Sequence, residues 1–150
     1  MKYLIILLLC TAVSAHTVLA EDGLVHVKSA HDVKSTADRL EKVLKAKGMT
    51  LFNRIDHAAG AKKVGRQLRP TELMIFGNPK VGSPLMACRQ TVGIDLPQKA
   101  LIWQDETGQT WLSYNSPAYL QSRHQVDGCG KVFDKVSKAL GNFAKAATQP

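Results

Sequence analysis

A short apolar run at the N-terminus constrains this chain more than any other feature. It follows the single positive charge of Lys2 and is too short to span a bilayer as a settled helix, which is typical of a secretory signal peptide. Small residues offer cleavage points after Ala15 and after Ala20, and we take the second. We therefore expect a signal peptide over residues 1–20 and one domain over residues 21–150.

Export would change which partners the positive charge of the chain suggests. The 20 Lys and Arg residues exceed the 12 Asp and Glu residues, a net charge of +8 that would suggest nucleic acid in the cytosol. Cleavage removes Lys2 and leaves +7. A periplasmic or secreted protein meets anionic surfaces and solutes instead, so we expect no nucleic acid as partner. We expect no stable membrane span after cleavage, and an uncleaved anchor stays open as the alternative.

The same compartment determines the expected state of the cysteines. Cys10 lies in the expected signal peptide, which leaves Cys88 and Cys129 as an even pair. An oxidising compartment favours a disulfide between them. The alternative is two free thiols, one of them a nucleophile.

The hydrophobic pattern predicts one α+β domain. With 45% hydrophobic and 21% charged residues, the composition is that of a globular chain. Strand, helix, several strands and helix follow one another, which favours a mostly antiparallel sheet with helices on one face. Strands are predicted at residues 23–29, 49–55, 71–76, 100–105 and 109–114, a first long helix ends near residue 47, and an amphipathic helix covers 131–147.

Several stretches resemble a bacterial family, the domain of unknown function 302 family. They are Arg54–Gly65, Arg69–Lys80, Pro84–Met86, Gly93–Pro97 and Trp111–Leu120. The resemblance covers about residues 23–124. It implies a TATA-binding-protein-like β-α-β4-α arrangement and a homodimer, but no activity. The chain departs from the family pattern at Cys88 and at Asp127–Gly130, which favours a disulfide particular to this protein.

The polar residues at the ends of predicted elements are the candidate ligand-binding site. The usual phosphate-loop, nucleophile-elbow and metalloprotease motifs are absent from the sequence, so we expect a binding protein rather than an enzyme. Residues at strand exits can converge on one rim of a sheet, where clefts form. We predict a cleft for a small polar or anionic ligand there, with local turn formation as the alternative role of these residues. The candidates are Asp56, His57, Asn78, Tyr114 and Asn115.

Two enzymatic alternatives use other residues. His57 and His124 together suit a divalent metal such as zinc or copper, although we expect no cofactor. A free Cys88 beside either histidine and Asn115 would form a thiol-nucleophile set. A basic cluster also follows His57; it suits an anionic ligand or, alternatively, is solvated surface. Its members are Lys62, Lys63, Arg66 and Arg69.

Overall fold

The computed structural model describes residues 17–19 and 23–150. Most of the expected signal peptide lies outside these residues, and its cleavage stays a prediction. Thr17–Leu19 form strand β1, which pairs antiparallel with β2. None of the described helices is long and apolar enough to cross a membrane.

The described strands form one six-stranded sheet in the order β1-β2-β6-β5-β4-β3, and each strand is antiparallel to its neighbours. The predicted α+β class is confirmed. Short helices interrupt the β-α-β4-α order without changing it. After β1, the strands are β2 (Leu24–Lys28), β3 (Thr50–Asp56), β4 (Thr71–Gly77), β5 (Gln98–Gln104) and β6 (Thr110–Asn115).

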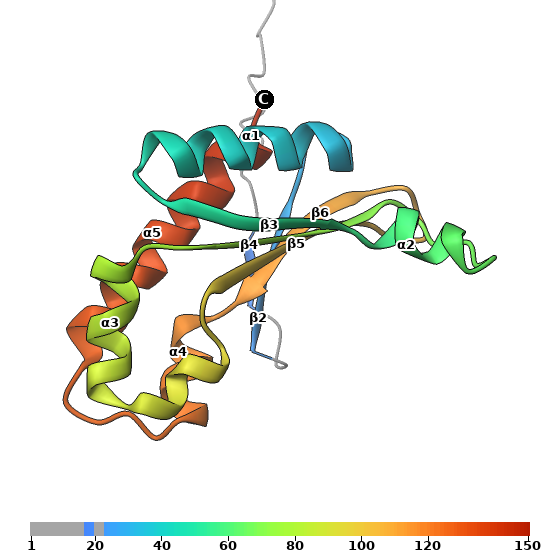
Figure 1. The fold of residues 1–150 in the computed structure, drawn as a ribbon. Coiled ribbons are helices and arrows are strands. Elements are labelled where there is room, and N and C mark those ends of the chain that lie inside the picture. Colours follow the sequence, from blue (N-terminus) through green and yellow to red (C-terminus); the bar gives the residue numbers. More distant parts are fainter. Residues whose placement is uncertain (1–16, 20–22) are drawn as a thin grey trace, which may run out of the picture.

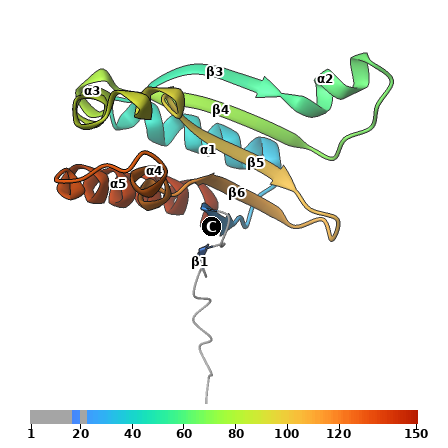
Figure 2. The ribbon, with the colours of Figure 1, turned by 90° about the horizontal axis from the view of Figure 1, so that it is seen from below.

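Two long helices cover one face of this sheet. Helices α1 (Val33–Ala46) and α5 (Gly130–Thr148) pack against each other and against the strands (Figure 1). The short helices lie toward the ends of the strands, with α2 far from α3 in both views (Figure 2). They are α2 (His57–Lys63), α3 (Pro79–Cys88), the 3-10 helix η1 (Gln90–Ile94) and α4 (Pro117–Arg123).

Local chemistry explains where the first helix begins and which side faces the sheet. The Asp32 side chain caps α1 by accepting the backbone N–H of Ser35 at 2.6 Å. Apolar residues then recur at helical spacing, so one stripe is buried. That stripe includes Val33, Ala37, Leu40 and Leu44.

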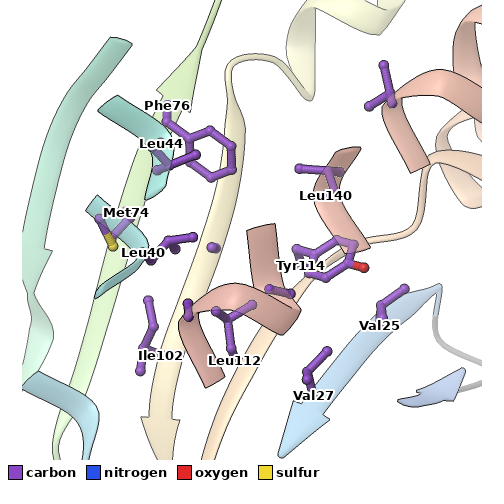
Figure 3. Close-up of a cluster of buried hydrophobic side chains, with 14 of the residues drawn as sticks. Val25, Val27, Leu40, Leu44, Met74, Phe76, Ile102, Leu112, Tyr114 and Leu140 are labelled. Atoms are coloured by element: carbon purple, nitrogen blue, oxygen red, sulfur yellow. The ribbon is translucent and has the colours of Figure 1, made fainter. Parts of the chain in front are cut away.

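The core lies between the helices and the inward side of the strands. Alternate residues of β4, β5 and β6 enter it, among them Met74, Phe76, Ile102 and Leu112 (Figure 3). The strands predicted at residues 100–105 and 109–114 are present as β5 and β6, and they pair with Trp103 directly opposite Trp111.

Because neighbouring strands are antiparallel, the segments that connect them lie at two opposite ends of the sheet. The pocket end holds the starts of β3 and β5 and the ends of β4 and β6, together with α3, η1 and α4. The arm end holds the end of β3, the start of β4 and the β5–β6 hairpin, together with α2. In Figure 1, α2 projects to the right while α3 and α4 lie at the lower left.

Candidate functional site

The five candidate ligand-binding residues do not form one rim. Asp56 and His57 follow β3 at the arm end, whereas Asn78 and Asn115 follow β4 and β6 at the pocket end. The expectation of convergence overlooked that antiparallel neighbours end at opposite edges of a sheet. Only strands that point the same way bring their exits together.

At the arm end, Asp56 and His57 lie at the start of helix α2. The Asp56 carboxylate accepts the backbone N–H of Ala59 at 2.8 Å and caps α2. His57 is the first residue of that helix and is exposed. The arrangement explains Asp56 as a cap, the kind of local role that turn and helix starts require.

At the pocket end, Tyr114 is part of the core rather than of a cleft. It is buried among apolar side chains (Figure 3), and burial raises the pKa of its phenol. Asn115 continues β6 and is opposite Leu24 of β2. Neither residue lines the pocket described below.

Asn78 does border a pocket. It caps α3, where its Oδ1 accepts the Lys80 N–H at 2.9 Å and its Nδ2 donates to the Gly48 carbonyl at 2.8 Å. Both halves of its amide are therefore engaged, and it holds α3 against the loop that precedes β3. Asn78 shapes the pocket wall instead of offering a free polar group.

The pocket lies between α3, η1 and the adjoining strand ends, with a volume of about 260 Å³. Its lining is predominantly apolar and contains no Asp, Glu, His, Lys, Arg or Cys side chain. Two further polar side chains, Ser83 and Gln98, border it. The main apolar contributors are Met49, Phe52, Val81, Leu85, Met86 and Leu96.

Gln98 is a candidate site residue that sequence reasoning missed. It is only 8% exposed, and its side-chain amide has no hydrogen-bond partner among the described residues. No fully buried side-chain nitrogen or oxygen of the described residues lacks a partner, so the amide atoms of Gln98 are accessible and a ligand or water in the pocket can bond them. Gln98 is opposite Phe76 on the helix-covered face. The available signal was its alternation with Ala100 and Ile102, which places a polar residue at an inward position.

His124 lies in a different network from His57. Its ring is buried at 8% exposure, with Nε2 at 2.6 Å from Asp95 Oδ2 and Nδ1 at 3.1 Å from Thr91 Oγ1. These bonds join the end of α4 to η1 and the residue after it. His57 and His124 therefore belong to opposite ends of the sheet, and the described residues contain no group of three or more His, Cys, Asp or Glu arranged to hold a metal.

The cysteine pair is bonded as predicted. Cys88, the last residue of α3, forms a disulfide with Cys129, which directly precedes α5. In this state Cys88 has no thiol to act as a nucleophile. The bond joins the pocket-forming helix to the long helix of the core.

Fold and site together define a small α+β domain with one helix-covered antiparallel sheet and an uncharged apolar pocket at one end. The chain matches the family described as "Domain of unknown function DUF302" over residues 25–143. It belongs to this family, and the match continues into the C-terminal helix, beyond the region that carries the sequence resemblance.

The similar proteins differ in how much of their own length the match covers. The proteins named "Fluoride-specific ion channel FluC 1" from Brucella suis and Brucella abortus are 48% identical to this chain over 108 residues, or 72% of it. That stretch covers 42% and 40% of their lengths, so the chain spans about two fifths of these curated relatives. A crystal structure of an uncharacterized DUF302 protein from Bacillus stearothermophilus has a TM-score of 0.76 at 19% identity, covering 83% of this chain and 98% of that one.

Proposed function

We propose that this protein is a non-enzymatic binding domain whose pocket takes a small, uncharged molecule with an apolar body and one hydrogen-bonding group. The observation that carries the proposal is the unpartnered amide of Gln98, nearly buried beside an apolar pocket. A ligand that bonds this amide would replace the water that can otherwise reach it, and the amide would fix the orientation of the ligand.

The lining supports this ligand class over the polar or anionic one expected from the sequence. No lining side chain carries a charge, so nothing in the wall would neutralise a buried anion. Apolar walls with few polar groups are typical of small-molecule sites, and 260 Å³ suits a ligand of one or two rings. The lack of acidic, basic or thiol groups in the lining favours binding over acid–base or nucleophilic catalysis.

A matched pair of probes tests the role of Gln98. Indole and indene have nearly the same shape, but only indole has an N–H donor. We expect ligand-observed NMR to show tighter binding of indole to the wild type, and Gln98→Leu to abolish that preference while retaining indene. Equal binding of both probes to the wild type would contradict the proposed role.

A second variant tests the pocket itself. Gly82 borders the pocket, and a Cβ at this position meets only Leu96 Cδ1, at 3.8 Å. Gly82→Leu should fill the space and remove binding of both probes. Gly60→Leu on α2 is the control, because a Cβ there meets nothing within 4 Å. Probe binding that survives Gly82→Leu would exclude this pocket.

We also propose export and a position beside a membrane. The signal-like N-terminus supports export to the periplasm or the medium. The relatives named as fluoride-specific ion channels are matched over 42% and 40% of their lengths, which supports a domain that accompanies a channel. Intact-mass measurement of the exported protein separates the cleavage positions: cleavage after Ala15 keeps β1, and cleavage after Ala20 removes it.

Homodimerisation through the open face of the sheet is the partner proposal. The face opposite α1 and α5 carries partly exposed apolar side chains on three adjacent strands, and a stable dimer needs about 1,000 Å² of buried surface. Sedimentation should show a dimer that Leu101→Glu dissociates; a monomeric wild type would contradict the proposal. The apolar residues on this face are Leu73, Ile75, Leu101, Trp103 and Trp111.

A further inference from the structure

The segment between β3 and β4, residues 57–70, is a projecting arm with its own surface chemistry. It comprises α2 and the loop that follows, and it extends away from the helices of the core (Figures 1 and 2). No residue of α2 is buried, and every residue from 62 to 70 is exposed. The arm therefore contributes little to the core, and its composition needs another explanation.

The arm concentrates positive charge that no carboxylate neutralises. It contains four basic and no acidic residues, and none of the four forms an ion pair among the described residues. Arg69 donates from Nε to the Gln104 carbonyl, a contact that leaves its charge uncompensated. The four basic residues are Lys62, Lys63, Arg66 and Arg69.

The nearby carboxylates are mostly engaged elsewhere. Asp56 caps α2, and Glu72 pairs with Arg54, which also binds Asp38 and Glu41 on α1. In the adjoining hairpin, Asp105 accepts the indole N–H of Trp111, and Glu106 adds one opposing charge. The bonds of Asp56 and Asp105 are to neutral groups and leave their charges in place, so three nearby carboxylates oppose the arm without forming an ion pair with it, and the arm itself carries four positive charges.

Two large apolar side chains are exposed among these charges. Val64 is 74% exposed and Leu68 is 49% exposed, although neither has a core position to fill. Gly65, with φ of +73°, turns the chain between them at the end of α2. Cationic side chains next to exposed apolar ones are typical of segments that bind the interface of an anionic membrane.

We propose that the arm binds an anionic lipid surface, with the four basic side chains on the phosphates and Val64 and Leu68 in the interfacial layer. The apolar pocket described above lies at the opposite end of the sheet, and no residue of the arm lines it. This inference is independent of the pocket and shares only the proposed membrane location with the function above.

Vesicle binding with two charge-matched variants tests the proposal. The arm variant carries Lys62→Gln, Lys63→Gln, Arg66→Gln and Arg69→Gln. The control replaces four exposed, unpaired lysines of α5 in the same way, and each variant loses four charges. The control substitutions are Lys131→Gln, Lys135→Gln, Lys138→Gln and Lys145→Gln.

We expect the wild type to co-sediment with vesicles that contain phosphatidylglycerol and not with pure phosphatidylcholine. The arm variant should partition onto the vesicles roughly tenfold or more weakly than the wild type. Its loss should exceed that of the control, because only charges held near the membrane surface contribute to binding. Val64→Ser with Leu68→Ser should lose several-fold at unchanged charge. Equal losses in both charge variants, no effect of the serine pair, or binding to soluble polyglutamate without vesicle binding would overturn the proposal.

Discussion

The two ends of the sheet differ in how they are held and in what they present. The pocket end is closed by three helical segments, a disulfide and the Asp95–His124–Thr91 network, and it encloses an uncharged apolar space. The arm end consists of exposed chain with unneutralised positive charge. Pre-formed walls suit a small-molecule site, whereas an exposed, projecting segment suits contact with a larger surface. The two ends of the sheet therefore suit different partners.

The largest expected effect concerns the disulfide, which closes a loop over a sequence separation of 41. Replacing both Cys88 and Cys129 by Ser should lower the free energy of unfolding by up to about 4 kcal/mol, because the unfolded chain regains the entropy of that loop. Hydrogen exchange should rise in α3 while α2 is unchanged. Equal denaturation midpoints for the variant and the wild type would mean that the pocket end is held by other contacts.

The His124 network should have the next largest effect. His124→Leu deprives Asp95 and Thr91 of their buried partner and should lower the free energy of unfolding by about 1–3 kcal/mol. Arg123→Gln is the control: its contact with Asp95 is 3.5 Å long and half-exposed, and should contribute about 0–1 kcal/mol. Urea denaturation of both variants measures the difference, and equal losses would show that burial of the network is unimportant.

A glutamine at each end of β5 offers a comparison of opposite sign. Gln98→Leu places an apolar side chain at an apolar pocket wall and breaks no hydrogen bond within the described residues, so it should raise the free energy of unfolding by about 0–1 kcal/mol. Gln104→Leu removes a bond from Nε2 to the Gly108 carbonyl and should lower the same quantity. Thermal and urea unfolding measure both. Destabilisation by Gln98→Leu would mean that this amide is satisfied in solution.

The smallest effect concerns Asp105 at the arm end, and only its pH dependence falls in the acid range. Bonds from the Trp111 indole, Thr107 and Gln109 lower the pKa of Asp105 from 3.8 to about 2. Because the folded-state pKa is the lower one, this carboxylate stabilises the fold above pH 4, and that contribution is lost as the pH falls toward 2.

Asp105→Asn tests that assignment. The variant should be less stable than the wild type at neutral pH, and the difference should shrink on acidification. Glu106→Gln in the same turn is the control, since Glu106 is exposed and has none of these bonds. Urea midpoints at several pH values measure the change, and a difference that does not depend on pH would rule out Asp105 as its source.

Much of the fold could be predicted from the chain, and much of the site could not. The inward stripe of α1 and the pairing of Trp103 with Trp111 follow from local periodicity. The predicted rim failed at Asp56 and Asn78 because strand direction, not strand position, decides which end an exit occupies. Tyr114 was taken for a rim residue because it lies near the end of its strand, although its alternation with Leu112 places it on the inward side.

By itself, the sequence determined the α+β class, the family resemblance, the net positive charge and the cysteine pair, since these depend on composition, period and compartment. Tertiary structure decided that the pocket is predominantly apolar and that Gln98, but not His57, is among the polar residues at its wall. It also separated the basic arm from that pocket by the length of the sheet. The physical reason is that the burial of a side chain and the identity of its neighbours depend on how several helices and strands pack together. The sequence of a single strand or helix does not specify them.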